Sequence, residues 1–143
     1  MKVFCDTSVL VAAADAEHQH HDRSIKVIRG VKAGEAYCAM HSLAEFYTTM
    51  TRYPRRGMGV SPALAIAAVR DILKTFTSVG LTANEYVNTL ERSAASGVTG
   101  AVVYDALILR CAEKIDADIV FTWNVGDFQR VALPGWAPKI QAP

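Results

Sequence analysis

The sequence predicts an α/β fold: a three-layer α/β/α sandwich with a central, mainly parallel sheet. Short runs rich in β-branched and aromatic residues alternate along the chain with longer segments of helical periodicity. Strands that alternate with helices form parallel βαβ units joined by right-handed crossovers. Hydrophobic residues make up 51% of the chain and charged residues 20%, a balance that suits a sheet covered on both faces. The 143 residues fit one domain, residues 1–143.

Five segments have the composition of strands. The first, in residues 2–6, contains Val3, Phe4 and Cys5 and stops at Asp6, because aspartate is poorly tolerated inside a buried strand. We therefore expect Asp6 at the carboxyl end of that strand. The other strands are expected at 36–39, 77–79, 118–122 and, more weakly, 139–141.

The segments between the strands have the patterns of helices. Ser61-Pro62 offers an N-cap and a first-turn proline, and Thr82 to Glu85 forms a capping box. The segment after Gly100 is almost continuously apolar, which predicts a well-buried helix. The expected helices cover Ser8 to Ala14, 20–33, 42–53, Ala63 to Phe76, 82 to about 96, and about 103–116.

Overall charge and cysteine content exclude some classes of protein. Lys and Arg total 15 against 14 for Asp and Glu, so net charge indicates neither a nucleic-acid binder nor an enzyme for acidic substrates. Cys5, Cys38 and Cys111 are odd in number and have apolar neighbours, which predicts reduced core thiols and a cytoplasmic protein. No apolar run approaches the ~20 residues of a membrane span, and Asp6 interrupts the N-terminal run too early for a signal peptide.

Carboxylates in apolar surroundings form the main candidate site. Asp6 follows the first strand, and in parallel sheets ligands bind beyond the carboxyl ends of the strands. Glu45 lies in the first turns of the helix after the second strand. Asp105 opens the most apolar helix, where an isolated charge would be costly. We expect these three carboxylates to converge.

The fourth strand supplies further polar groups. It runs into Thr122, and Asn124 and Asp127 are expected in the loop that follows. Converging carboxylates raise one another's pKa unless a cation compensates, so such a cluster suits a metal site. Oxygen ligands favour Mg²⁺ or Mn²⁺, which activate water and stabilise phosphodiester hydrolysis.

Structural roles are the alternative for each residue taken singly. Asp6 could cap the helix that starts at Ser8, Asp105 could interact with its helix dipole, and Asp127 could be a turn residue. The combination of residues favours the metal site.

Four ordered motifs resemble those of the PIN-domain ribonucleases, specifically the VapC-type toxins of type II toxin–antitoxin modules. They are VFCDTSVLVAA, SLAEFYTTMTR, VYDALILRCAE and DIVFTWNVGDF, and they span nearly the whole chain. By this resemblance Asp6, Glu45 and Asp105 match the acidic metal ligands, and Thr7 or Ser8 matches a hydroxyl near the metal or its water.

The last motif departs from the commonest pattern of the family. Many relatives have Asp where this chain has Asn124, which leaves Asp127 as the possible fourth carboxylate. Thr122 is expected to support the site. Which of Asn124 and Asp127 contacts the metal stays open at this point.

The resemblance implies a Mg²⁺-dependent endoribonuclease, with Mn²⁺ as a possible substitute, and Asp6, Glu45, Asp105 and Asp127 as its catalytic carboxylates. It also implies a structured or single-stranded RNA substrate, such as a tRNA, a cognate antitoxin that silences the enzyme, and a homodimer. The alternative is a non-catalytic PIN-like module for RNA binding or regulation. A phosphatase of the haloacid dehalogenase type is less favoured, because Ser8 stands where a second aspartate would be needed.

Three other features have both a functional and a structural interpretation. Arg52, Arg55 and Arg56 surround Tyr53 and Pro54 and could contact RNA phosphates, although a solvated helix end is favoured. The histidines in HQHH (residues 18–21) lack partners at zinc-ligand spacing, which favours a solvated loop or helix start. The apolar faces of 61–76 and 85–96 could bind a second copy or an antitoxin, or could belong to the core.

Overall fold

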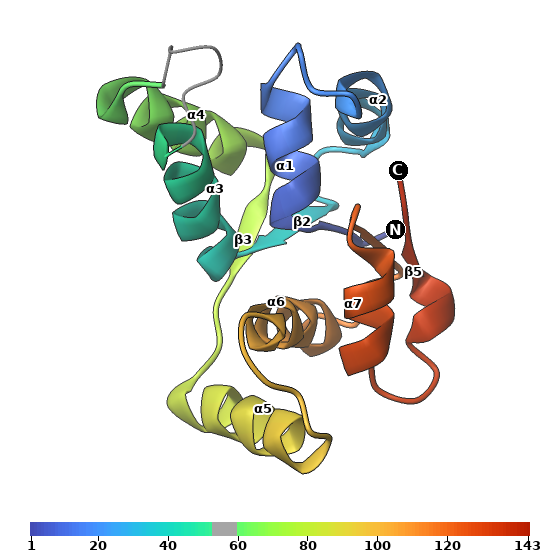
Figure 1. The fold of residues 1–143 in the computed structure, drawn as a ribbon. Helices are drawn as coiled ribbons and strands as arrows, with labels where there is room; N and C mark the ends of the chain where they lie inside the picture. Colours follow the sequence, from blue (N-terminus) through green and yellow to red (C-terminus); the bar gives the residue numbers. More distant parts are fainter. Residues whose placement is uncertain (53–59) are drawn as a thin grey trace.

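The computed structural model describes residues 1–52 and 60–143, and it confirms the predicted α/β/α fold (Figure 1). The described residues contain one five-stranded sheet in which all paired strands are parallel, in the order β3-β2-β1-β4-β5. The strands are β1 (Val3–Cys5), β2 (Ala36–Ala39), β3 (Thr77–Val79), β4 (Ile119–Phe121) and β5 (Ile140–Gln141). All five predicted strands are present, and β1 ends one residue before Asp6, as expected.

Helices cover both faces of this sheet. In Figure 1, α1 to α4 lie on one side of the strands and α5 to α7 on the other. The helices are α1 (Thr7–Ala14), α2 (His21–Gly30), α3 (Met40–Arg52), α4 (Pro62–Thr75), α5 (Ala83–Ala95), α6 (Val102–Lys114) and α7 (Val125–Val131). A 3-10 turn, Ala137–Lys139, precedes β5.

The two predicted helix caps are formed. The Leu64 amide donates to Ser61 Oγ at 3.2 Å, with Pro62 as the first residue of α4. At the start of α5, the Glu85 amide donates to Thr82 Oγ1 at 3.2 Å, and the Thr82 amide donates to Glu85 Oε2 at 2.8 Å. These reciprocal bonds satisfy amides that a helix start would otherwise leave unpaired.

The sequence predicts that Asn124 and Asp127 lie in a loop after β4, and this prediction was wrong for Asp127. Residues Val125–Val131 form α7, so Asp127 lies in the first turn of a helix. This helix has only seven residues and contains Gly126, which is too little chain for helical periodicity to be recognised. Phe128, which is fully buried, holds α7 against the sheet.

The core divides into two clusters, one on each face of the sheet. On β1, Phe4 belongs to the cluster with α6 and α7, whereas Val3 and Cys5 belong to the cluster with α1 to α4. This alternation is that of a strand buried on both faces. Cys5, Cys38 and Cys111 are buried free thiols, as predicted.

The order of the strands places a crevice beside β1. The chain proceeds from β1 through β2 to β3 on one side and later adds β4 and β5 on the other. The ends of β1 and β4 are joined by a bond from the Asp6 amide to the Phe121 carbonyl, at 2.9 Å. Ligands of such sheets bind at this point of reversal, beyond the carboxyl ends of the strands.

Two helices keep apolar side chains exposed to solvent. The exposed residues are Leu64, Ile66 and Leu73 on α4, and Tyr86, Val87 and Leu90 on α5. Core packing therefore does not account for the whole apolar pattern of either helix. Within residues 1–52 and 60–143, no helix has the length and apolar character needed to cross a membrane.

Candidate active site

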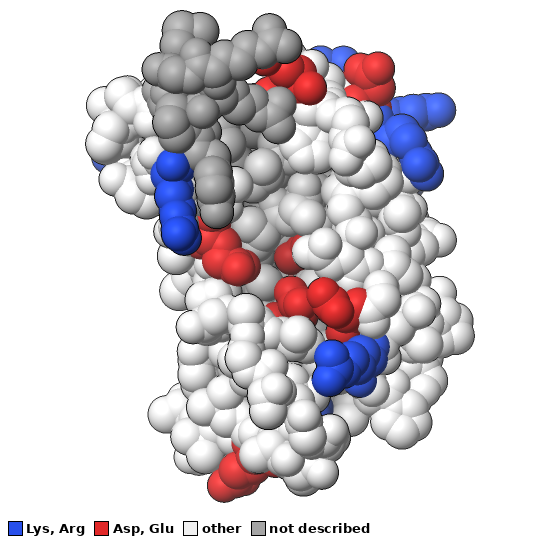
Figure 2. Space-filling model, in the orientation of Figure 1, with Lys and Arg blue, Asp and Glu red and all other residues white. Residues whose placement is uncertain are grey.

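A cavity of about 460 Å³ lies beyond the carboxyl ends of β1 and β4. Asp6, Glu45 and Asp105 line it, and they come from the end of β1, from α3 and from the first turn of α6. Figure 2 shows acidic side chains gathered in a hollow on this face of the molecule, with basic side chains on several sides. The three carboxylates expected to converge therefore share one cavity.

Asp6 has both a structural and a site-forming position. Its Oδ2 accepts hydrogen bonds from the Ser8 amide at 3.2 Å, Ser8 Oγ at 2.7 Å and Thr122 Oγ1 at 2.9 Å. The bond to the Ser8 amide makes it the N-cap of α1. Burial raises the pKa of Asp6, and these hydrogen bonds act in the opposite direction. The carboxylate is therefore fixed in orientation before any ligand binds.

Glu45 is held by a hydroxyl from the neighbouring helix. Thr7 Oγ1, in the first turn of α1, donates to Glu45 Oε1 at 2.9 Å. His41 lies one turn earlier on α3, with its Nε2 atom 3.9 Å from the same oxygen, and its ring stacks on Tyr104. Thr7 and His41 thus approach Glu45 from two different elements.

The electrostatics of the site are most evident at Asp105. Burial raises its pKa to about 7, and the negative charges of Asp6, Asp127 and Glu45 contribute in that order. Like charges disfavour the ionised form of a neighbouring carboxyl group. The mutual repulsion inferred from the sequence is therefore present, and a cation in the cavity would relieve it.

A second row of polar groups connects β4 to the carboxylates. Thr122 is fully buried; its Oγ1 donates to Asp6 and accepts from the Asn124 amide at 3.0 Å. Ser8 Oγ similarly donates to Asp6 and accepts from the Trp123 amide at 3.0 Å. The two hydroxyls link Asp6 to consecutive residues of the β4–α7 connection.

Asn124 and Asp127 occupy different positions relative to the cavity. Asn124 lines the cavity and is the N-cap residue of α7, yet its side chain makes no capping hydrogen bond. Asp127 is exposed and is not among the residues that line the cavity, although its charge reaches Asp105. The Asn124 carboxamide is therefore better placed to contact a metal ion in the cavity than the Asp127 carboxylate.

One wall of the cavity was not predicted from the sequence. His18, Gln19 and His20 line it together with Trp123. The His20 ring stacks on Trp123 with 3.7 Å between ring centroids and 8° between planes, and Trp123 Nε1 donates to the buried Ser24 Oγ at 2.9 Å. The predicted helix start is confirmed, because His20 is the N-cap of α2 and His21 its first residue. The predicted solvation was wrong for His18 and His20, which are half-buried.

The donor set fits a hard divalent cation in its chemistry. Three carboxylates, three hydroxyls and two carboxamides line the cavity, and such oxygen atoms are the preferred ligands of Mg²⁺ and Mn²⁺. They do not form a closed coordination sphere: in the part of the chain that the structure describes, no three His, Cys, Asp or Glu side chains are grouped closely enough to hold a metal ion. The HQHH histidines likewise form no metal group there.

Comparisons with known proteins show which family and fold the chain resembles. The family model described as PIN domain matches residues 3–133. Ribonuclease VapC40 of Mycobacterium tuberculosis, strains CDC 1551 / Oshkosh and ATCC 25618 / H37Rv, is 32% identical over 116 residues. These residues cover 80% of this chain and 81% of that protein.

Solved structures with the same fold include VapC20, FitAB and VapBC2. VapC20 of Mycobacterium tuberculosis, described as a sarcin-ricin loop cleaving toxin, has a TM-score of 0.74 at 20% identity, covering 92% of this chain and 96% of that one. FitAB bound to an IR36 DNA fragment gives 0.72 at 14% identity, with coverages of 99% and 94%. VapBC2 from Rickettsia felis, bound to a promoter DNA fragment, gives 0.67 at 14% identity, with coverages of 100% and 99%.

Proposed function

The chain belongs to the PIN-domain family, and from that premise we propose that it is a divalent-metal-dependent endoribonuclease and the toxin of a toxin–antitoxin pair. Relatives named as a ribonuclease and a toxin support this class of activity. The observation that carries the proposal is the position of Asp6, Glu45 and Asp105, from three separate segments, around one cavity. The bond that is cleaved is an RNA phosphodiester.

Asp6, Glu45 and Asp105 would hold Mg²⁺, or Mn²⁺ in its place. We assign the additional oxygen ligand to Asn124, because it lines the cavity with a side chain that caps no helix. Asp127 then acts through its charge on Asp105. A bound divalent ion lowers the pKa of a coordinated water and neutralises charge that develops on a phosphoryl group.

The hydroxyl groups of the site position the carboxylates. Ser8 and Thr122 orient Asp6, and Thr7 orients Glu45, so the site does not depend on the ion to arrange these groups. In the metal-free chain Asp105 holds a proton on its carboxyl group for part of the time at neutral pH, because its pKa is about 7. Binding of a cation is therefore coupled to loss of that proton.

The wall formed by His18, Gln19, His20 and Trp123 is suited to contact the nucleotides beside the cleaved bond. Aromatic rings stack on unpaired bases, and single-stranded RNA is commonly recognised in this way. The hypothesis that Arg55 and Arg56 contact RNA phosphates stays a prediction, since both lie outside the described residues. The RNA itself, a tRNA or another structured or single-stranded molecule, has to be found by experiment.

A cognate antitoxin and a second copy of the chain are the proposed protein partners. VapC20, which shares the fold, is described as a toxin, and the DNA-bound FitAB and VapBC2 share the fold as well. The exposed apolar residues of α4 and α5 supply two surfaces that protein partners could cover. We propose that the antitoxin silences the ribonuclease.

Cleavage of cellular RNA tests the proposed activity. The chain, freed of co-purifying protein, is incubated with total RNA in Mg²⁺, in Mn²⁺ and in EDTA, and the cut ends are sequenced. We expect metal-dependent cuts that Asp6→Asn reduces by at least about 100-fold, because a metal ligand is lost. Asp71→Asn, which alters an exposed aspartate on α4, is the matched control and should cleave normally.

Cleavage by Asp6→Asn at the rate of the unaltered chain would contradict the proposal. Binding of RNA without cleavage in any metal, by a folded chain, would instead favour the non-catalytic RNA-binding module. The RNA pool for that comparison must include ribosomal and transfer RNA, so that a missing substrate is not mistaken for a missing activity.

A further inference from the structure

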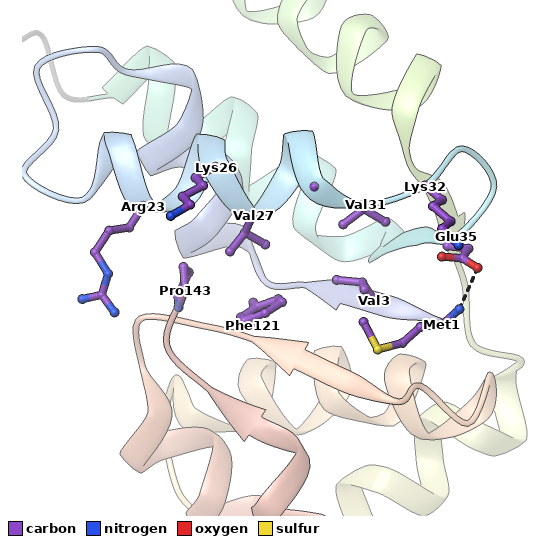
Figure 3. A pocket seen from close by; sticks show the side chains of 11 residues that line it. Met1, Val3, Arg23, Lys26, Val27, Val31, Lys32, Glu35, Phe121 and Pro143 are labelled. Carbon is purple, nitrogen blue, oxygen red and sulfur yellow. Dashed lines mark hydrogen bonds and ion pairs between the residues drawn. The ribbon is translucent and has the colours of Figure 1, made fainter.

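A larger cavity, of about 740 Å³, lies between α2 and the strands β1 and β4. Figure 3 shows Val27 of α2 and Val31, the residue after α2, on one side of it and Val3 and Phe121 of the strands on the other. None of the carboxylates of the candidate active site lines it. This cavity is therefore separate from the carboxylate cavity.

Three of the four charged side chains that line this cavity are positive. Arg23 and Lys26 lie at one end near Pro143, and Lys32 lies at the other end beside Glu35 (Figure 3). Glu35 Oε1 accepts from the N-terminal ammonium at 2.7 Å, so its charge is already paired. No ion pair of Lys26 or Lys32 occurs among residues 1–52 and 60–143.

We propose that this cavity binds a small amphipathic anion, with its apolar body between α2 and the strands and its negative group at Arg23 and Lys26. The volume lies within the roughly 300–1,000 Å³ of small-molecule sites, which are mainly apolar with a few placed polar groups. The charged groups stand at the ends of the cavity, whereas an extended peptide would need hydrogen-bond partners along its length. A charged head on a hydrocarbon body matches that distribution.

Arg23 connects the cavity to the candidate active site. Its Cζ atom lies 5.1 Å from the centre of the Trp123 ring, and Trp123 lines the carboxylate cavity. A ligand anion bound to this guanidinium group would therefore change the charge beside the indole. The fluorescence of Trp123, isolated by Trp136→Phe, should change when the cavity is filled.

Titration with decanoate tests the proposal by binding alone. The chain must carry no added residues at either end, because Met1 and Pro143 both line the cavity. We expect saturable changes in the amide NMR signals of Val27, Val31 and Phe121, with a matching change in Trp123 fluorescence. The neutral alcohol 1-decanol should bind at least about tenfold more weakly, since it lacks the charge.

Two charge reversals on α2 locate the anion. Lys26→Glu should weaken decanoate binding about tenfold, because it places a negative charge where the carboxylate binds. Arg29→Glu is the matched control: it makes the same change of charge on the same helix at an exposed residue that does not line the cavity. Decanoate affinity should remain unchanged in that variant.

Several results would overturn the proposal. They are an absence of saturable binding, equal weakening by Lys26→Glu and Arg29→Glu, and signal changes that map to the cavity between α1 and α4. Binding of an acidic peptide in place of decanoate would assign the cavity to a protein segment instead. All these readouts are independent of RNA cleavage, so their failure leaves the proposed ribonuclease untouched.

Discussion

At the scale of single residues, Asp6 combines the two interpretations that the sequence left open. It caps α1 through the Ser8 amide, and the same carboxylate lines the cavity with Glu45 and Asp105. A cap needs an acceptor at the start of a helix, and a site in a parallel sheet lies at the carboxyl end of a strand. Since β1 leads into α1 after one residue, both requirements apply to residue 6.

The pKa of Asp105 predicts how stability depends on pH. In the unfolded chain this carboxyl group titrates near its ordinary value of 3.8, whereas in the folded chain its pKa is about 7. The folded state binds the proton more tightly, so the contribution of Asp105 to stability falls as pH rises from about 4 to about 7 and then levels off. Asp105→Asn should remove this decline.

Urea unfolding in EDTA measures that effect. At pH 8 we expect Asp105→Asn to be more stable than the unaltered chain by roughly 1–2 kcal/mol, less than the full pKa shift implies because the group is partly exposed. At pH 4 the two chains should differ little. Equal stability of the two chains at both pH values would show that burial and the neighbouring carboxylates do not raise the pKa of Asp105.

Trp123 is predicted to position the site through its neighbours. Trp123→Phe removes the bond to the fully buried Ser24 but keeps a ring beside His20. We expect the free energy of unfolding to fall by about 1–2 kcal/mol, because the Ser24 hydroxyl loses its partner in the core. RNA cleavage should also fall, because the indole bond to Ser24 helps to hold residue 123 in place, and the backbone amide of that residue donates to Ser8, which orients Asp6.

The control for this prediction is Trp136→Phe. Trp136 packs on the core and Lys139 lies over its ring, but it does not line the carboxylate cavity. Its replacement should leave cleavage unchanged. Loss of cleavage in both variants to the same degree would indicate a general effect of losing an indole.

At the scale of helices and strands, local signals determined which elements could be predicted. The starts of α4 and α5 were predicted because caps involve neighbouring residues, whereas α7 was missed because seven residues carry no clear period. The same distinction holds in the site. Asp6, Glu45 and Asp105 follow from strand ends and apolar surroundings, but the path that brings His18 and His20 to Trp123 depends on tertiary contacts.

The capping box of α5 gives a prediction at this scale. Thr82→Ala should lower the free energy of unfolding by about 1 kcal/mol, because the Glu85 amide loses its acceptor. The remaining bonds of Glu85, to the Thr82 amide and to Lys114 Nζ, limit the loss. Thr99→Ala, at an exposed residue outside any helix, is the matched control and should change stability by less than about 0.5 kcal/mol. A larger effect at Thr99 would contradict the role of the cap.

At the scale of the whole molecule, the sheet, the site and the exposed apolar faces occupy different parts of the chain. The residues that line the carboxylate cavity come from α1, α3, α6, Asp6 directly after β1, and the segments that precede α2 and α7. The exposed apolar residues of α4 and α5 do not line it. Protein partners could therefore bind α4 and α5 without displacing any residue that lines the carboxylate cavity.

We predict that two copies of the chain form a homodimer through the exposed apolar residues of α4 and α5. A stable dimer buries about 800 Å² per partner, usually with apolar residues at its centre. Light scattering should therefore give about 31 kDa, twice the 15.5 kDa of the chain. Either Val87→Glu on α5 or Leu73→Glu on α4 should halve that mass, because a buried charge disfavours the interface. Asn88→Glu, at the exposed residue next to Val87, controls for added charge. A mass of 15.5 kDa for the unaltered chain at every concentration would show that the exposed faces of α4 and α5 bind a partner other than a second copy of the chain.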